Sequence, residues 1–309
     1  MNKILVTIPH RGIGDLIYIL PLLKSLYQTY AVKIDILSNL TNKAKYVYKN
    51  EDFVNSIQEF ELDHKNLIFN LNKKFEYLHK INSYKANLLI VTGRHSSLIL
   101  PYHLSNAKNK KMFDLFFFNF KDPKTKKLLS SKKIYNNTKD LNLKVFIDDF
   151  NLKFSKKKVL EKNILFNIDS HHEQNNWPVK NFVNIIKKIK DNYDKIFINF
   201  SPSNNSFIKE IPENILKNTN ITLTYQLKFN KILEIIKSCE VIVGNESGLV
   251  CLGLSYGKKV ISIYDIKYTQ PESSIINGNV KYFNSTKSTD LDIIEGILKI
   301  LNMKWTQLL

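Results

Sequence analysis

The sequence has only two cysteines, Cys239 and Cys251, and neither lies in a CxxC pair or in a Cys/His cluster with the spacing of metal ligands. This scarcity excludes a disulfide scaffold and a cysteine-based metal site. A reducing compartment such as the cytoplasm fits it best.

Long apolar runs are also missing. The richest run, residues 115–118, is far shorter than the roughly 18 residues that a membrane-spanning helix needs. The apolar residues 4–8 are followed directly by Pro9, His10 and Arg11, which is too early for a secretory signal. We therefore expect a cytoplasmic protein whose association with a membrane is at most peripheral.

Low-complexity segments, short-period repeats and long Gly/Ser or Pro linkers are absent as well. The 309 residues are 43% hydrophobic and 24% charged, which is typical of a soluble globular chain, and domains of roughly 100–200 residues make two domains the natural expectation. Lys and Arg number 46 against 28 Asp and Glu, a formal net charge of +18. Such a field attracts phosphorylated metabolites, acidic lipids or nucleic acid, and its sign alone does not choose among them.

Short apolar runs alternate with segments of helical spacing along most of the chain, which predicts the α/β class with parallel sheets covered by helices on both faces. In the first half, the expected strands are 4–8, 32–37 and 88–92, and the expected helices are 16–26 and 71–84. In the second half, the expected strands are 164–168, 195–200, 221–223, 240–243 and 259–263, and the expected helices are 179–190, 207–216, 232–238, 249–256 and 290–301. The pattern weakens between 106 and 162, so we expect domains at 1–160 and 161–309.

The first motif that bears on chemistry is residues 11–15, RGIGD, between the first strand and the first helix. Ligands of open parallel sheets bind outside the carboxyl ends of the strands, and glycines there let a backbone approach a ligand closely. A dinucleotide fingerprint needs a third glycine and an acidic residue after the second strand, and neither is present. Asp15 has two interpretations: a carboxylate that caps the helix start, or a catalytic group.

Residues 241–248, VIVGNESG, form a second strand–turn–helix motif. The backbone amides at a helix start carry partial positive charge, so Ser247 and Gly248 either hold a diphosphate or Ser247 only caps the helix. Glu246 either binds a sugar hydroxyl or is a solvated loop carboxylate. In a third motif, residues 175–182, Pro178 indicates a helix start, and Trp177 and Phe182 are expected in the core.

Together, and in this order, the three motifs resemble the bacterial heptosyltransferases, glycosyltransferase family nine. The resemblance rests on a GxGD turn with a downstream Pro21, a mid-chain WPxxxF, and a late VGNxSG followed by Gly257-Lys258. It implies a GT-B fold, in which two Rossmann-like domains face each other across a cleft. It also implies that the first domain binds the acceptor, that the second binds a nucleotide sugar, and that the reaction inverts the anomeric centre.

The resemblance further implies a role for particular residues. Asp15 is the candidate general base that deprotonates the acceptor hydroxyl. The candidate acceptor-side residues are Arg11, Gly12 and Gly14, and the candidate donor-side residues are Ser170, His171, Asn175, Lys180, Glu246, Ser247 and Gly248. No cofactor or metal is implied beyond the nucleotide sugar, with ADP-heptose as the first candidate donor. The one DxD string, Asp290-Leu291-Asp292, is interpreted as the N-cap of the last helix.

Three positions depart from the family pattern and leave the donor open. Asn175 stands where a Lys or Arg usually precedes the tryptophan, Glu246 replaces Asp, and Cys251 replaces His. Lys180, or Arg11 with His10, would compensate for the first change, and Cys251 is interpreted as a small buried helix residue. The same departures are compatible with a catalytically silent relative that binds a glycan or a partner.

The expected function is therefore inverting transfer of a heptose or related sugar to an anionic lipooligosaccharide or other surface-glycan acceptor. Lysine clusters between 108 and 158 either face such an acceptor and the inner face of the cytoplasmic membrane, or form a solvated surface. A nucleic-acid-binding protein is a further alternative. It rests on net charge alone, without a recognition motif, and no nucleic-acid partner is expected.

Overall fold

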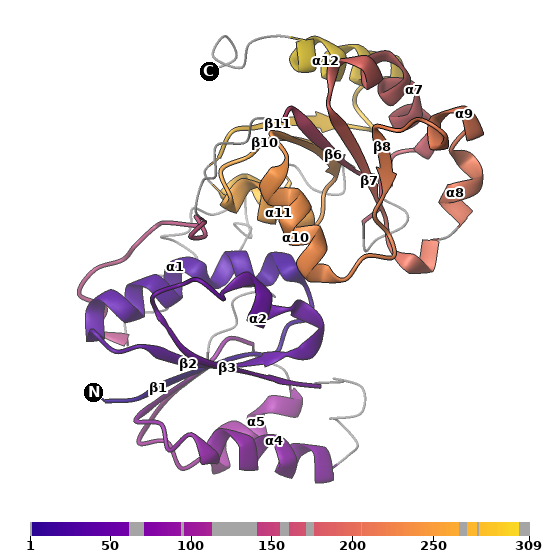
Figure 1. The fold of residues 1–309 in the computed structure, drawn as a ribbon. Helices are drawn as coiled ribbons and strands as arrows, with labels where there is room; N and C mark the ends of the chain where they lie inside the picture. The colour runs from indigo at the N-terminus through magenta and orange to yellow at the C-terminus, as the bar shows by residue number, and fades with distance from the viewer. Residues whose placement is uncertain are drawn as a thin grey trace. The chain divides into compact units, whose positions relative to one another are not determined.

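The structure, a computed structural model, describes residues 2–61, 71–93, 96–112, 141–154, 161–170, 176–204, 206–265, 271–276 and 278–302. It divides into two compact units, Met1–Lys153 and Phe154–Leu309. Each unit is built around its own parallel sheet (Figure 1).

The first unit has a five-stranded sheet in the order β3-β2-β1-β4-β5, with every pair of neighbours parallel. Its strands are β1 (Ile4–Ile8), β2 (Ile34–Asn39), β3 (Val54–Phe60), β4 (Leu88–Val91) and β5 (Asn109–Met112). The sequence pattern predicted β1, β2 and β4, which are entirely buried. It missed the two edge strands, because β3 and β5 are only partly buried and contain too many polar residues to read as apolar runs.

Helices cover both faces of this first sheet. They are α1 (Ile13–Tyr30), α2 (Ala44–Val47), α4 (Leu71–Ser83) and α5 (Ser96–Leu104), with a 3₁₀ turn, η1, at Leu40–Asn42. Figure 1 shows α1 and α2 on one face and α4 and α5 on the other. Tyr77 and Ile81 of α4 and Leu98 of α5 pack on Leu5 and Leu89 of the sheet. Alternate strand residues thus supply the core on each face.

The second unit has a six-stranded parallel sheet in the order β11-β10-β9-β6-β7-β8. Its strands are β6 (Asn163–Asn167), β7 (Lys195–Asn199), β8 (Ile221–Leu223), β9 (Val241–Asn245), β10 (Lys259–Tyr264) and β11 (Val280–Asn284). Only β11, a partly buried edge strand, was missing from the prediction. Counted from the first strand of each unit, the strand order is 3-2-1-4-5 in the first sheet and 3-2-1-4-5-6 in the second. Both are the Rossmann order, so both units have a point where the strand order reverses.

The helices of the second unit are α7 (Val179–Ile189), α8 (Ser206–Glu210), α9 (Glu213–Leu216), α10 (Phe229–Ser238), α11 (Gly248–Ser255) and α12 (Asp290–Asn302). The single helix expected at 207–216 is wrong, since two short helices, α8 and α9, occupy that stretch. Pro212 is the N-cap of α9 with extended backbone angles, and a proline inside one continuous helix would lack the N–H that the helix needs.

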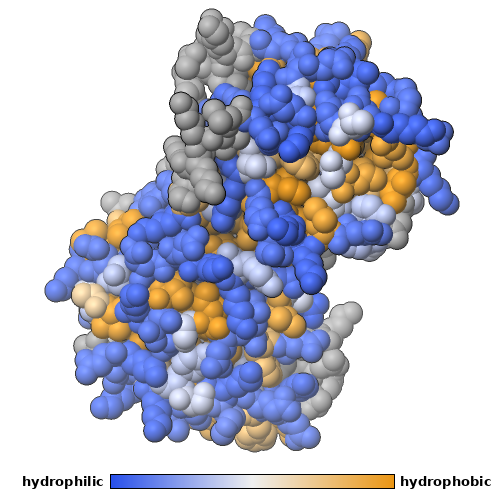
Figure 2. Space-filling model, viewed as in Figure 1, coloured by the Kyte–Doolittle hydropathy of each residue, from blue (hydrophilic) through white to orange (hydrophobic). Residues whose placement is uncertain are grey.

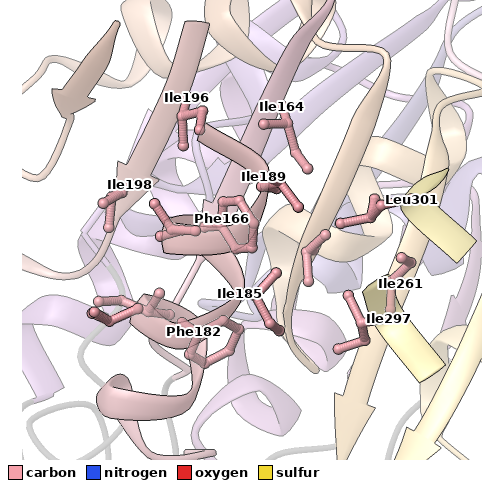
Figure 3. Packing of buried hydrophobic residues seen from close by; sticks show 14 of the residues in the cluster. Ile164, Phe166, Phe182, Ile185, Ile189, Ile196, Ile198, Ile261, Ile297 and Leu301 are labelled. Atoms are coloured by element: carbon pink, nitrogen blue, oxygen red, sulfur yellow. The ribbon is translucent and has the colours of Figure 1, made fainter. Parts of the chain in front are cut away.

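The core of the second unit lies between the sheet and the pair α7 and α12 (Figure 3). Phe166 of β6 and Ile261 of β10 meet Phe182 and Ile185 of α7 and Ile297 of α12 there, and all five are buried. The expected core position of Trp177 and Phe182 is confirmed. Both are buried, with ring centroids 5.0 Å apart in an edge-to-face arrangement.

Candidate active site

The turn after β1 lies at the β1/β4 switch point of the first sheet, and side chains at the end of β2 bind it by hydrogen bonds. Three consecutive carbonyl groups of this turn each accept a hydrogen bond from a side chain that ends β2 or follows it. The donors are Asn39 Nδ2 to the Pro9 carbonyl at 3.1 Å, Asn42 Nδ2 to that of His10 at 3.0 Å, and Thr41 Oγ1 to that of Arg11 at 3.3 Å. Since both amide donors are buried, the turn has little freedom to move.

The turn is equally close to the end of β4. His10 Nε2 lies 2.5 Å from the Thr92 carbonyl oxygen. A Cβ atom on the next residue, Gly93, would lie 2.9 Å from Pro9 Cγ and 3.1 Å from His10 Nε2. The glycine therefore makes room for the turn, which is pinned between the carboxyl ends of β2 and β4.

Asp15 lies at the third position of α1, shortly after the turn just described. Its Oδ2 accepts a hydrogen bond from the Gly12 backbone N–H at 3.0 Å, so the helix-capping interpretation is confirmed. The side chain is still half-buried rather than enclosed, and a carboxylate accepts more than one hydrogen bond. A Cβ atom on Gly12 would approach Asp15 Oδ2 to 2.8 Å, so the glycine allows this carboxylate position.

In the second unit, strands β6 and β9 pair at the switch point, and Gly244 of β9 is opposite Asn167 of β6. A Cβ atom on Gly244 would lie 2.4 Å from the Asn167 carbonyl oxygen and 2.9 Å from its Cβ. The missing side chain thus lets the two strands approach closely. Asn167 Nδ2 donates to Ser247 Oγ at 3.0 Å, across the gap between the two strand ends.

We expect Gly244→Ala to lower the free energy of unfolding by about 3 kcal/mol or more, since overpacking against a backbone cannot be relieved by a side-chain rotation. Gly253→Ala on α11 is the matched control. Its Cβ would meet only the side-chain ends of Ile242 and Val260, at 2.5 and 3.3 Å, and alanine favours the helix. Urea unfolding of both variants measures the difference. Equal losses would show that the close approach at Gly244 is not special.

Ser247 is the N-cap of α11, as one of its two interpretations predicted. Its Oγ accepts a hydrogen bond from the Val250 backbone N–H at 3.5 Å. Gly248 and Leu249 are the first two residues of α11, so the helix offers no carbonyl acceptor to their backbone N–H groups. The helix dipole adds partial positive charge at the same place. Capping and anion binding are therefore compatible at this helix start.

Glu246, between β9 and α11, is bonded to the protein on both carboxylate oxygens. Oε1 accepts from the Ser273 N–H at 2.8 Å, and Oε2 accepts from Ser262 Oγ at 2.6 Å and Ser273 Oγ at 2.9 Å. The interpretation of Glu246 as a solvated loop carboxylate is thus wrong, because these hydroxyls hold it against β10. Burial raises the pKa of the adjacent Tyr282, and the negative Glu246 raises it further, so this phenol stays protonated beside Ser273.

A buried carboxylate that the sequence analysis missed, Asp169, lies two residues after the end of β6. It is 6% exposed. Its Oδ1 accepts from Asn176 Nδ2 at 3.1 Å and Asn204 Nδ2 at 2.9 Å, and its Oδ2 accepts from the Ser201 N–H at 2.8 Å. One side chain therefore joins the segment after β6, the start of α7 and the segment after β7.

The residues around Asp169 extend this connection to β9. Asn176 Oδ1 accepts from the Ser170 N–H at 2.8 Å and from Asn245 Nδ2 at 3.4 Å. Asn245 Oδ1 in turn accepts from the Trp177 N–H at 3.0 Å. Asn176 and Asn204 also line a cavity of about 300 Å³, with Trp177 and residues of α7 and α8. The carboxyl ends of three strands thus share one polar network beside a cavity.

Residues 103–287 match the family model described as Glycosyltransferase family 9 (heptosyltransferase), which is more than half of the chain. The chain belongs to glycosyltransferase family 9. No curated protein sequence gives a match.

Solved structures support the fold of this family 9 glycosyltransferase. A family 9 glycosyl transferase from Veillonella parvula DSM 2008 superposes with a TM-score of 0.74 at 16% identity, covering 96% of this chain and 89% of that one. The E. coli ADP-heptose lps heptosyltransferase II gives 0.73 at 14% identity, covering 99% of both chains. The E. coli heptosyltransferase WaaC with ADP gives 0.73 at 12% identity, covering 96% and 99%. The fold is therefore GT-B-like, with two Rossmann-like parallel α/β units.

The other predicted site residues of this glycosyltransferase have the following positions. Gly14 lies in the first turn of α1 beside Asp15, and Arg11 is exposed on the preceding turn. Ser170 follows Asp169, and Lys180 is exposed on the first turn of α7. His171 and Asn175 lie outside the described residues. Cys251 is buried within α11, as expected.

A signal for the missed residues was present in the sequence. Several buried strands end in asparagine, among them β2, β6, β7 and β9, and these side chains tie neighbouring strand ends together. Asn199 Nδ2, for example, donates to Asn167 Oδ1 at 2.8 Å. A polar amide at the end of an apolar run is unfavourable unless it is bonded, so the repeated pattern indicated a network at the carboxyl edge.

The start of α12 corrects one further expectation of the sequence analysis. The N-cap is Thr289 rather than Asp290: Thr289 Oγ1 accepts from the Asp292 N–H at 3.2 Å, and Asp292 Oδ2 accepts from the Thr289 hydroxyl at 2.6 Å. These bonds to Thr289 lower the pKa of Asp292. Asp290 accepts from Trp177 Nε1 at 2.7 Å. In the part of the chain that the structure describes, no three His, Cys, Asp or Glu side chains gather as a metal site.

Proposed function

We propose that this family 9 glycosyltransferase transfers a heptose or related sugar, with inversion, from a nucleoside diphosphate sugar to a hydroxyl of a lipooligosaccharide or other surface glycan. The observation that carries the proposal is the position of its two polar turns. The Asp15 turn follows β1 and the Ser247 turn follows β9, so each lies at the switch point of its sheet, where ligands of such sheets bind.

On the donor side, the start of α11 is the proposed site of the diphosphate. The amides of Gly248 and Leu249 offer hydrogen-bond donors and partial positive charge, and Ser247 keeps the helix start ordered. Lys180, exposed on α7, supplies a mobile positive charge, and Ser170 supplies a hydroxyl next to the Asp169 network. These groups stabilise the negative charge that grows on the departing nucleoside diphosphate. His171 and Asn175 belong to the same proposed site by their sequence positions.

On the acceptor side, Asp15 is the proposed general base. It takes the proton of the acceptor hydroxyl as that oxygen forms a bond to the anomeric carbon, while the bond from this carbon to the diphosphate oxygen breaks on the opposite face. The electron pair of the broken bond leaves with the diphosphate, so the anomeric configuration is inverted. The Gly12 N–H orients the carboxylate, and Arg11 and Gly14 lie next to it on the acceptor side.

Two findings bear on the donor and on the residues that shape its site. Solved structures of the E. coli heptosyltransferase WaaC contain ADP and ADP-2-deoxy-2-fluoro heptose, which makes ADP-heptose the first candidate. Glu246 has three hydrogen bonds from serines of its own unit, so its proposed part is to shape the Ser247 turn rather than to hold the sugar alone. A glycolipid acceptor would place the enzyme on the inner face of the cytoplasmic membrane.

A nucleotide panel tests the donor site. We expect ADP to raise the melting temperature more than UDP, GDP or CDP, since a ligand bound only to the native state adds about 2.7 kcal/mol at 100 times its Kd. Lys180→Ala should reduce this shift. Lys209→Ala, at an exposed lysine of α8, is the matched control and should keep it. The absence of a shift with every nucleotide would contradict the proposed donor site, and a preference for another base would replace ADP.

A further inference from the structure

Large apolar side chains reach the surface together at one place in the first unit, the helix pair α4 and α5. Half of the exposed large apolar residues of the described chain lie on these two helices: Leu71, Phe75, Ile99, Leu100 and Leu104. Their exposed fractions run from 37% to 59%. Patches of apolar surface are visible among hydrophilic residues at this end of the first unit (Figure 2).

These side chains are not the outer edge of the core. On α4, Tyr77 and Ile81 face the sheet and are buried, while Leu71 and Phe75, one turn apart, project from another side of the helix and are more than half exposed. On α5, Leu98 is buried against the sheet and Leu104 is 49% exposed. Each helix therefore has a second apolar stripe that is exposed to solvent. A group of exposed apolar side chains marks an interaction surface, whereas single surface leucines do not.

The charge around these stripes is predominantly positive. The described residues 71–93 and 96–112 contain seven lysines and one glutamate, a net charge of +6 without the histidines. The lysines are Lys73, Lys74, Lys80, Lys85, Lys108, Lys110 and Lys111. The glutamate, Glu76, is 3.4 Å from Lys73, so it offsets only one of them. None of the helices in the described residues is long and apolar enough to cross a bilayer.

We propose that the α4–α5 surface binds the face of an anionic lipid bilayer, with Phe75 and Leu104 entering the headgroup region and the lysines over the negative lipids. An apolar stripe flanked by lysines is the pattern of a surface that lies on a membrane without spanning it. A second copy of the chain is a poorer occupant, because it would bring two surfaces of net charge +6 together. The proposal concerns where the enzyme docks, and it does not depend on which sugar is transferred.

The experiment is co-sedimentation of the full chain with vesicles of phosphatidylglycerol and phosphatidylcholine, compared with phosphatidylcholine alone. We expect binding only to the anionic vesicles, and weaker binding as salt shortens the Debye length from about 10 Å to about 3 Å. Equal binding to both kinds of vesicle, or to neither, would overturn the proposal.

Matched variants locate the surface. Phe75→Ser combined with Leu104→Ser is expected to lower the partition coefficient on the order of tenfold or more. The control is Leu291→Ser, at a residue of α12 that is 61% exposed and carries no such stripe, and it should bind like the wild type. Since the substituted residues are exposed, the double variant and the control should both melt at the wild-type temperature.

The lysines have a control pair as well. Lys73→Gln with Lys108→Gln should lower binding by about fivefold for each charge removed. Lys209→Gln with Lys217→Gln, at exposed lysines of the second unit, should change it little. Equal losses in the two pairs would overturn the α4–α5 assignment. So would a dimer, seen by sedimentation without vesicles, that Phe75→Ser abolishes. Because the assay contains no sugar substrate, its failure would leave the proposed transfer reaction untouched.

Discussion

Asp15→Asn is expected to reduce the kcat of sugar transfer by roughly two to four orders of magnitude, since the amide cannot accept the acceptor proton. The amide oxygen still accepts the Gly12 N–H that Asp15 accepts now, at 3.0 Å, so the helix start should persist. Melting temperature and the shift with nucleotide should therefore match the wild type. Initial rates at saturating donor, followed by release of the nucleoside diphosphate, measure the effect.

The matched control for this substitution is Asp191→Asn, at an exposed aspartate of the 3₁₀ turn that follows α7. It removes the same charge far along the chain from Asp15 and should turn over normally. If Asp15→Asn also turned over normally, Asp15 would not be the base. A variant that loses nucleotide binding together with turnover would indicate damage to the fold.

Gly12→Ala examines the position of the same carboxylate without removing it. The new Cβ would lie 2.8 Å from Asp15 Oδ2, which is the far end of a flexible side chain, and Gly12 has ordinary extended backbone angles. Stability should therefore change little while the carboxylate turns away. We expect a smaller loss of kcat than in Asp15→Asn, of about tenfold to a hundredfold, since small displacements of a catalytic group are costly.

Asp169→Ala is expected to lower the free energy of unfolding by about 3 kcal/mol or more, since hydrogen bonds to charged groups contribute about 1.5–3 kcal/mol and three donors would lose their acceptor. Those donors are Asn176, Asn204 and the Ser201 N–H. Asp169→Asn keeps one acceptor oxygen and should lose less. Urea unfolding monitored by fluorescence gives both values.

Asp169→Ala should also weaken the donor site. Asp169 accepts a hydrogen bond from Asn176, and Asn176 in turn accepts one from the Ser170 N–H, so loss of the carboxylate removes the support that holds Ser170 in this network. We expect the KM for the nucleotide sugar to rise more than kcat falls, and Asp169→Asn to restore part of it. Asp191→Ala provides the matched acidic control. Unchanged stability in Asp169→Ala would contradict the network, and a pure kcat loss would contradict its role in binding.

Much of the fold was predictable because its strands are short, apolar and buried on both faces. β1, β6 and β9 read directly as apolar runs followed by polar turns. The edge strands β3, β5 and β11 did not, since a strand with one covered side needs fewer apolar residues and is defined by its neighbour. The two short helices on either side of Pro212, α8 and α9, were predicted as one helix because helical spacing alone does not register the missing N–H.

The candidate site was predictable in part for the same reason. Asp15 and Ser247 stand at helix starts, where local chemistry already restricts their roles, and both cap their helices. Glu246 could not be interpreted locally, because the serines that bond it are 16 and 27 residues away. Asp169 was missed altogether, since its partners are contributed by segments after two different strands.

The amino-acid sequence by itself determined the buried strands, the helices that follow several of them, the two glycine-containing turns and the motifs of the family. Each of these depends on residues that are close together along the chain. The tertiary structure decided which strand ends become neighbours. β6 pairs with β9 although two strands and four α-helices lie between them in the sequence, and this pairing brings Asn167 to Ser247, 80 residues away. Hydrogen bonds of that length in sequence exist only after the sheet has formed, because the order of its strands, and not local spacing, sets their partners.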